Sequence, residues 1–195
     1  MYVGDATKNI KGGNMKIIVQ AGGKGTRLEG LTHNKPKCLV PVNNLPILFY
    51  AFQKFKDADF TIIADYKTDV LEKYLAAFAN QYKFNIVKAT KKGTASGIKE
   101  AIAPLLDDEP FMIIWCDLIL SDGFEIPTET GNYIGISKDF ECRWSYVENK
   151  FIKTPSKENG VAVLFVFENK KVLQNVPEEG AFVDWLKTQP IAFKR

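Results

Sequence analysis

Short apolar runs typical of buried strands alternate with helix-like segments between residues 15 and 117, and this alternation constrains the fold more than any other feature. Strands that are covered on both faces read as continuous apolar runs, and the helices between them have to cross over the sheet. The pattern therefore predicts an α/β fold with a mostly parallel sheet and helices on both of its faces. The four strand-like runs are MKIIVQ, FTIIAD, NIVKA and FMIIWCD.

Three segments between these runs have the pattern of amphipathic helices. Pro46 is well placed near the opening turn of the first, and Thr94 is expected to cap the third. After residue 122 the alternation gives way to strand-like stretches and a closing helix. We expect this strand-rich second half to form a lid or an acceptor-binding wall on the open face of the sheet. The helices are PILFYAFQKF, DVLEKYLAAFANQY and TASGIKEAIAPLL, and the later stretches are NYIGIS, SYVENKFI, VAVLFVF and the helix EGAFVDWLKTQ.

Length and composition are those of an ordinary globular chain. With 195 residues, 46% of them hydrophobic and 25% charged, the chain suits one domain over residues 15–195, preceded by a flexible leader over residues 1–14. The longest apolar runs fall far short of the ~20 residues that a membrane-spanning helix needs, so we expect a cytoplasmic protein with no membrane partner. A net charge of +3, spread along the chain, gives no reason to expect nucleic acid as a partner.

A cationic, glycine-rich segment, QAGGKGTRL, follows the first strand-like run. In parallel sheets ligands bind beyond the carboxyl ends of the strands, and successive small residues let backbone N–H groups approach a polyphosphate. The segment is neither a dinucleotide fingerprint, since Leu28 stands where a third glycine is required, nor a P-loop. Arg27 and Lys37 beside such a loop suit the charge that develops during phosphoryl or nucleotidyl transfer.

The longer segment AGGKGTRLEGLTHNKPKCLVPVNNLPIL resembles the signature of the sugar-1-phosphate nucleotidyltransferase superfamily, in its compact bacterial form. The resemblance implies a Rossmann-like three-layer sandwich and a reaction in which a nucleoside triphosphate and a phosphorylated acceptor give a nucleoside diphosphate adduct and pyrophosphate. It also implies that Arg27 holds the β- and γ-phosphates and that Lys37 bridges toward the α-phosphate and the acceptor phosphate. The residues implied to cradle the nucleotide are Ala21, Gly22, Gly23, Gly25 and Thr26.

A second segment, KKGTASGIKEAI, is similar to the part of the family that contacts the base and opens the next helix. By that resemblance Gly93 lets the backbone approach the ring, and Thr94 borders the nucleotide. Uridylyl- and thymidylyltransferases of the family tend to have a glutamine where this chain has Lys88. An amide donates and accepts hydrogen bonds, whereas an ammonium only donates, so Lys88 favours CTP or GTP, whose bases offer acceptors.

The metal and acceptor residues are implied less completely. Asp117 directly follows a buried strand-like run, and its carboxylate suits Mg²⁺ chelated by phosphates; the family usually has GD there, and this chain has CD. The family's late carboxylate motif is missing, which leaves Asp184 as a candidate second ligand, with an exposed helix position as the plainer interpretation. We therefore expect either a chain that is shortened relative to active members of the family or a sequence that ends before their last metal-binding segment. Lys153, in a segment like the family's acceptor motif, is the candidate for holding the acceptor phosphate.

The sequence is compatible with three functional hypotheses. The leading one is an Mg²⁺-dependent enzyme that condenses a nucleoside triphosphate with a sugar 1-phosphate, for surface polysaccharide synthesis, and a homodimer is one assembly that it allows. A second is a CTP-dependent cytidylyltransferase acting on phosphocholine or another small phosphorylated alcohol, with an aromatic cage drawn from its tryptophans and Tyr146. The third is a non-catalytic nucleotide-binding homologue that has lost the second metal site.

Overall fold

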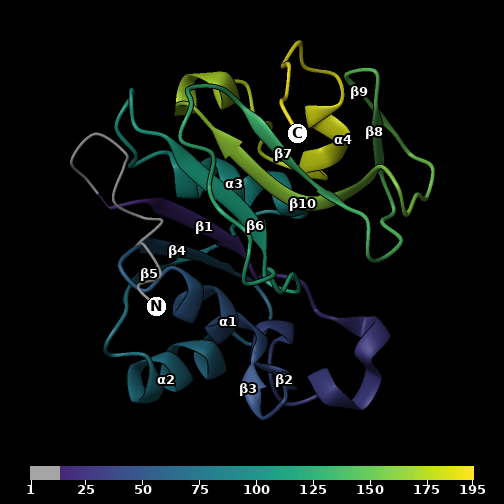
Figure 1. Ribbon diagram of the computed structural model, residues 1–195. Coiled ribbons are helices and arrows are strands. Elements are labelled where there is room, and N and C mark those ends of the chain that lie inside the picture. The colour runs from purple at the N-terminus through teal and green to yellow at the C-terminus, as the bar shows by residue number, and fades with distance from the viewer. Residues whose placement is uncertain (1–13) are drawn as a thin grey trace.

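An eight-stranded sheet lies at the centre of the computed structural model, which describes residues 14–195 (Figure 1). The strand order is β5-β4-β1-β6-β10-β8-β9, and β7 pairs with β10 outside this path. Apart from Asn14, the predicted N-terminal leader lies outside the described residues. No helix in the described part of the chain is long and apolar enough to cross a membrane.

The first half of the chain builds the parallel part of the sheet. Strand β1 pairs in parallel with β4 on one side and with β6 on the other, and β4 pairs in parallel with β5. The residues of β1 and β6 are almost entirely buried, as their continuous apolar runs predict. The carboxyl ends of four strands therefore meet along one edge of the sheet. The strands are β1 (Lys16–Gln20), β4 (Asp59–Ala64), β5 (Lys83–Lys88) and β6 (Phe111–Trp115).

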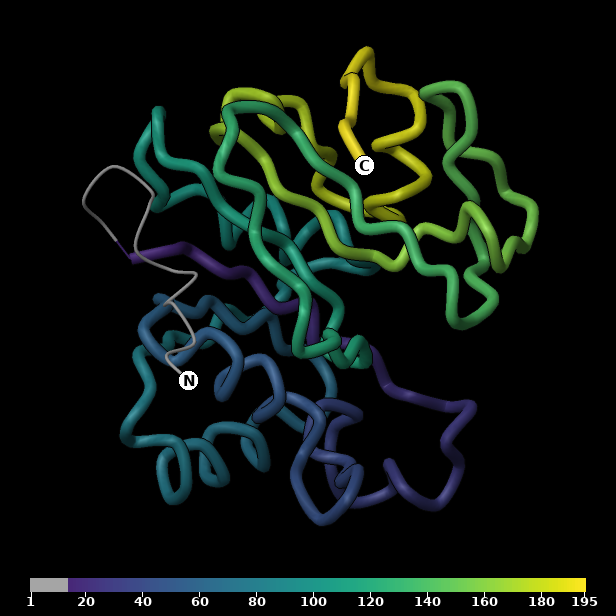
Figure 2. The backbone as a smooth tube through the Cα atoms, in the orientation of Figure 1, coloured from purple at the N-terminus to yellow at the C-terminus, as the bar shows by residue number. Residues whose placement is uncertain are grey.

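Helices cover both faces of this sheet, which confirms the three-layer α/β prediction. In Figures 1 and 2, α1 (Ile47–Lys54) and α2 (Thr68–Phe78) lie below the sheet, whereas α3 (Thr94–Ile102) and α4 (Phe182–Leu186) lie above it. Each pair of helices packs on its own hydrophobic core. Alternate residues of β1 enter the two cores, so the strand is buried from both sides.

The strands of the second half extend the same sheet and do not form a separate lid, whereas an acceptor-binding wall stays a prediction. Strand β10 pairs antiparallel with β6, which would otherwise be an unprotected edge. Its register with β7 shifts between Val161 and Phe165, where Val163 has a φ of 50°. The strands are β7 (Tyr133–Ser137), β8 (Ser145–Val147), β9 (Lys150–Ile152) and β10 (Gly160–Phe167).

Several short elements follow from local chemistry that the periodicity does not reveal. Asn43 and Asn44 both have positive φ, at 48° and 64°, which is the two-residue turn expected between the short strands β2 (Pro41–Val42) and β3 (Leu45–Pro46). The glycine-rich segment continues into two 3₁₀-helices, η1 (Thr26–Thr32) and η2 (Lys37–Leu39). A third, η3 (Lys170–Leu173), precedes α4.

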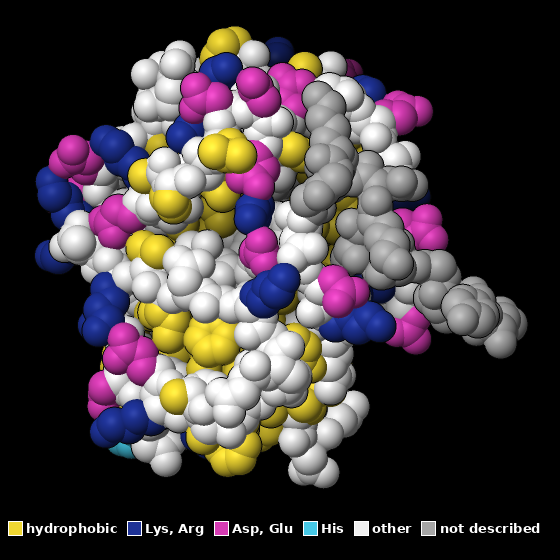
Figure 3. Space-filling view, turned by 90° about the vertical axis from the view of Figure 1, so that its left-hand side faces the viewer, with side chains coloured by type: hydrophobic (Ala, Val, Ile, Leu, Met, Phe, Trp, Pro, Cys, Tyr) yellow, Lys and Arg dark blue, Asp and Glu magenta, His cyan; other side chains and the backbone are white. Residues whose placement is uncertain are grey.

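Charges of both signs are mixed on the surface. On the face drawn in Figure 3, lysine and arginine side chains are interspersed with aspartate and glutamate around smaller hydrophobic patches. Among the described residues on that face, charges of one sign form no continuous patch.

Gly97 tests how closely α3 packs on the sheet. A Cβ at this position would lie 2.3 Å from Cγ2 of Ile63 on β4. We expect Gly97→Ala to lower the free energy of unfolding by about 1–2 kcal/mol, because overpacking outweighs the better helix propensity of alanine. Urea denaturation measures the change. Gly123→Ala, whose Cβ would have no atom within 4 Å, is the matched control and should change stability by less than ~0.5 kcal/mol.

Candidate functional site

The predicted site residues after β1 and β6 meet at the carboxyl edge of the sheet. Gln20 lies level with Trp115 at the ends of these neighbouring strands. The N–H of Ala21 donates to the carbonyl of Ile63 over 3.0 Å, and the N–H of Cys116 donates to the carbonyl of Gln20 over 3.2 Å. Beyond these bonds the two segments separate. The segment after β1 continues into the glycine-rich loop, and the segment after β6 continues to Asp117.

An ion pair between Lys37 and Asp117 stands at this edge. Lys37 Nζ donates a hydrogen bond to Asp117 Oδ2, and the side chains are 22% and 38% exposed. The two residues are 80 positions apart in sequence and were predicted to serve different groups, the phosphates and the metal. The structure places these opposite charges in direct contact.

The glycine loop adjoins this pair through Gly25. Its backbone is left-handed, with φ of 64° and ψ of 33°, and a Cβ there would lie 2.9 Å from Cγ2 of Thr32 and 3.2 Å from Cβ of Lys37. Thr32 Oγ1 holds the turn by donating to the carbonyl of Gly25 at 3.2 Å. Only glycine fits this conformation and this space without strain.

The remaining predicted residues of the loop differ in exposure. Gly22 is buried, and a Cβ there would lie 3.1 Å from Cβ of Asp65. Gly23 faces open space, because its Cβ would have no atom within 4 Å. Thr26 and Arg27 are exposed on η1. The loop thus presents uncovered backbone and an exposed guanidinium to solvent.

The second predicted segment is tied to the residues before α4. Gly93, with φ of 93°, approaches Gly180 so closely that a Cβ would lie 2.2 Å from the carbonyl oxygen of Gly180. The N–H of Gly180 donates to Lys92, and the N–H of Ala95 donates back to Gly180, each over 3.0 Å. Thr94 is the first residue of α3 and makes no capping bond, which corrects the sequence prediction; its Oγ1 accepts from the N–H of Phe182 at 2.8 Å.

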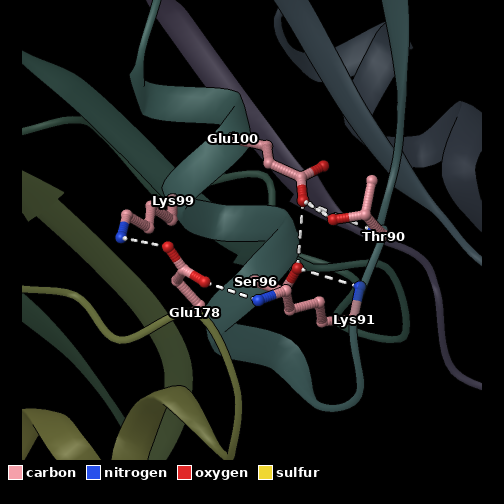
Figure 4. Close-up of polar contacts among 6 residues, drawn as sticks. All are labelled: Thr90, Lys91, Ser96, Lys99, Glu100 and Glu178. Carbon is pink, nitrogen blue, oxygen red and sulfur yellow. Dashed lines mark hydrogen bonds and ion pairs between the residues drawn. The ribbon is translucent and has the colours of Figure 1, made fainter.

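A polar network also holds this segment from the side of α3 (Figure 4). Glu100 Oε1 accepts hydrogen bonds from Thr90 Oγ1 at 2.6 Å and from Ser96 Oγ at 3.0 Å. Ser96 Oγ in turn accepts from the N–H of Lys91 at 3.2 Å. Sequence reasoning missed this network, although Ser96 and Glu100 have the i, i+4 spacing of helix neighbours.

Glu178 adds a second, more exposed clamp in Figure 4. Its carboxylate lies 2.5 Å from Lys91 Nζ and 3.6 Å from Lys99 Nζ. The hydrogen bond from Lys91 lowers the pKa of the Glu178 carboxyl below its usual value. The loop before α3 is therefore held from two sides.

Lys88, predicted to read the base, lies at the end of β5. Its side chain is 65% exposed, and Nζ forms an ion pair with Glu72 of α2 at 2.9 Å. The ammonium is thus engaged with a helix on the opposite face of the sheet from α3.

The predicted acceptor lysine and the second candidate metal ligand lie together. Lys153 Nζ and Lys187 Nζ are 3.7 and 3.1 Å from the same oxygen of Asp184. Both ammonium groups also lie 5.3 Å from the centre of the Trp144 ring. The hydrogen bond from Lys187 is the main cause of the lowered pKa of Asp184. Lys187 was not predicted as a site residue, although its i, i+3 spacing from Asp184 on a helix could have indicated the ion pair.

The carboxylates of the described residues set a limit on metal binding. No group of three or more His, Cys, Asp or Glu side chains within residues 14–195 is placed to hold a metal ion. Asp117 offers one carboxylate at a partly open strand end. That set fits Mg²⁺, which commonly binds through one or two carboxylates together with substrate phosphates and water.

The cysteines beside the ion pair do not supply a nucleophile. Cys38 and Cys116 are buried, and burial raises the pKa of the Cys38 thiol to about 12 and also raises that of Cys116. Both thiols are protonated at neutral pH and therefore unreactive.

A cavity of about 1090 Å³ lies on the other side of Asp117 in sequence, and neither Lys37 nor Asp117 lines it. Its wall begins at Leu118, next to Asp117, and continues over β7 and β10 with side chains such as Ile136 and Leu164. None of the predicted site residues lines it. The strand ends are the candidate functional site, because the charged groups and open backbone meet there.

Comparison with known proteins identifies the family of the chain. A family model described as "Nucleotidyl transferase" matches residues 16–129. The chain is 27% identical to a mannose-1-phosphate guanyltransferase of Neurospora crassa over 189 residues, 92% of this chain and 46% of that protein. It is 34% identical to the Gibberella zeae enzyme of the same name, over 57% of this chain and 32% of that protein. The chain thus spans half the length or less of these curated relatives.

Solved structures share the fold. The inositol-1-phosphate CTP transferase from T. maritima aligns with a TM-score of 0.66 and 21% identity, covering 90% of this chain and 81% of that one. HddC from Yersinia pseudotuberculosis, complexed with GMP-PN, aligns with a TM-score of 0.70 and 19% identity, covering 92% and 88%.

The Glu100 network gives a prediction that is independent of any reaction. Glu100→Ala leaves the exposed Thr90 hydroxyl and the buried Ser96 hydroxyl without their acceptor, and the loss at a buried group such as Ser96 costs about 1–3 kcal/mol. We expect amide exchange of residues 90–94 to become at least tenfold faster, measured by hydrogen exchange and mass spectrometry. The control is Glu178→Gln, which removes only exposed ion pairs and should leave exchange nearly unchanged. Equal amide protection of residues 90–94 in Glu100→Ala and in the unaltered chain would contradict the conclusion that Glu100 holds this segment.

Proposed function

The chain belongs to the nucleotidyl transferase family, and from that premise we propose that it transfers a nucleotidyl group from a nucleoside triphosphate to a sugar 1-phosphate. The products are a nucleoside diphosphate sugar and pyrophosphate. The observation that carries the proposal is the Lys37–Asp117 pair beside an open glycine loop, at the edge where parallel sheets bind ligands.

The glycine loop and η1 supply the phosphate-binding part of the proposed site. The uncovered backbone at Gly23 and the left-handed turn at Gly25 leave N–H groups free to face an anion. Arg27 is exposed next to this turn, where its planar guanidinium can contact two phosphate oxygens at once. We assign the β- and γ-phosphates to these groups.

The ion pair has to open for the nucleotide to bind. Asp117 would then hold Mg²⁺ by its carboxylate, and Lys37 would turn its ammonium to the α-phosphate. When bound with the triphosphate, Mg²⁺ neutralises negative charge that builds up on the leaving pyrophosphate. In the free chain, Lys37 neutralises Asp117 instead, so neither charge is left unpaired.

The transfer is an in-line displacement. An oxygen of the acceptor phosphate attacks the α-phosphorus, the bond from that phosphorus to the bridging oxygen of the β-phosphate breaks, and pyrophosphate leaves with the electron pair. The attacking oxygen is already anionic at neutral pH, so no general base is required. Arg27 and Lys37 contribute by position and charge, which is the usual basis of catalysis in phosphoryl transfer.

The cluster around Trp144 is the proposed acceptor side. Two ammonium groups and one carboxylate leave one positive charge in excess, which suits the phosphate of a sugar 1-phosphate. Helix α4 begins near the strand ends, because the ring of Phe182 packs on Trp115 with 6.3 Å between centres. Lys153 and Lys187 are therefore assigned to the acceptor phosphate.

The acceptor and the base are further parts of the proposal. Tyr146 is buried, and Trp144 already faces two ammonium groups, which weakens the aromatic cage expected for phosphocholine. Relatives named mannose-1-phosphate guanyltransferase support a sugar 1-phosphate and GTP, and CTP is the alternative. A non-catalytic homologue is the other alternative; nucleotide binding without turnover would select it.

Turnover of variants tests the nucleotide half of the site. Arg27→Ala, Lys37→Ala and Asp117→Asn should each lower kcat by about a hundredfold or more, since each removes charge stabilisation in the transition state. Pyrophosphate release measures this, with α-D-mannose 1-phosphate and GTP, CTP, UTP, dTTP or ATP in Mg²⁺. Lys73→Ala, on the exposed side of α2, is the control with unchanged rates. Rates within twofold of the unaltered chain in all three site variants would refute the assignment.

The acceptor assignment has its own kinetic signature. Lys153→Gln and Lys187→Gln should each raise KM for the sugar 1-phosphate by about tenfold or more, the loss expected for one charge-assisted hydrogen bond. KM for the nucleotide should stay the same. Steady-state kinetics with each substrate varied in turn separates the two effects, and a rise confined to the nucleotide would contradict the acceptor role.

A further inference from the structure

Gln20 carries a buried polar atom that nothing in the described protein satisfies. The residue is 7% exposed, and Oε1 is the only buried side-chain nitrogen or oxygen of residues 14–195 without a hydrogen-bond partner. The residue ends β1, a strand whose other interior positions are apolar. Leaving such an acceptor unpaired destabilises a fold, whereas an apolar side chain of similar size would pack there without that cost.

The amide of Gln20 lies between the two segments, the glycine loop and the start of α3, that the family resemblance implies for the nucleotide. Strand residues alternate between faces, so Gln20 shares the face of Ile18, which packs in the core under α3. Its neighbours across the sheet are Ile63 and Trp115. Helix α3 packs closely on the sheet beside Gln20, because a Cβ at Gly97 would lie only 2.3 Å from Cγ2 of Ile63.

The other end of the amide faces the glycine loop. Gln20 Nε2 would lie 3.5 Å from a Cβ at Gly22. The two ends of a primary amide are interchangeable by rotation, so the open end can present a donor or an acceptor.

We propose that Gln20 binds the nucleoside part of the nucleotide and contributes to the choice of base, an inference that rests on the proposed function. The phosphates already have Arg27, Lys37 and the glycine backbone, and a neutral amide adds little to them. The edge of a base offers donors and acceptors together, which an amide complements. Lys88, by contrast, is exposed and paired with Glu72, so the buried amide is the better-placed base reader.

Two substitutions of Gln20 test this role, because stability and binding should change in opposite directions. Gln20→Met and Gln20→Leu remove the unsatisfied group, so the thermal midpoint without ligand should rise by about 2–4 °C. Affinity for the preferred nucleotide with Mg²⁺ should fall about tenfold, equivalent to about 1.4 kcal/mol. The differences in affinity among the five nucleoside triphosphates should also become smaller. Differential scanning calorimetry and titration calorimetry measure the two quantities.

Ile18→Val is the matched control on the same strand and face. It shortens a core side chain, so it should lower the midpoint and leave nucleotide affinity unchanged. Unchanged affinity in both Gln20 variants, or a lowered midpoint in both, would overturn the inference about Gln20 alone. Failure of the unaltered chain to bind any of the five nucleotides would overturn the proposed function and, with it, this assignment.

Discussion

The parallel pairing of β1 with β4 on one edge and β6 on the other is the constraint on which the site depends. It brings the glycine-rich loop and Asp117 to the same edge, although nearly a hundred residues of chain separate them. Both cores pack against β1, so the position of this strand is fixed from two faces and two edges. The loops that leave it can stay open because the strand beneath them is rigid.

The charges at that edge are arranged in pairs that a ligand can replace. Lys37 forms an ion pair with Asp117, and Asp184 forms ion pairs with Lys153 and Lys187. Such exposed or half-exposed pairs contribute little to stability, so opening them costs little when a phosphate or a metal offers a stronger partner. Around the loop before α3 the opposite holds, because Glu100 and Gly180 hold its backbone in one conformation.

Local patterns predicted much of the fold. The apolar runs of β1, β4 and β6 could be recognised in the sequence, the glycine-rich motif nominated Arg27 and Lys37, and the end of an apolar run nominated Asp117. The antiparallel pairing of β10 with β6 was not predictable, because an apolar run does not state its direction or its neighbour. Long-range contacts were equally hidden: Thr94 and Phe182 are 88 positions apart. The unsatisfied Oε1 of Gln20 could not be inferred from the sequence either, because it depends on the burial of that side chain in the fold.

Hydrogen exchange of the chain with and without nucleoside triphosphate and Mg²⁺ tests most directly whether the nucleotide occupies the strand ends. The account predicts that the triphosphate bound most tightly slows amide exchange in residues 20–28 and 89–97 and leaves the β7 and β10 segments around the large cavity unchanged. Protection confined to residues 133–140 and 157–166, with none in the two loops, would contradict it.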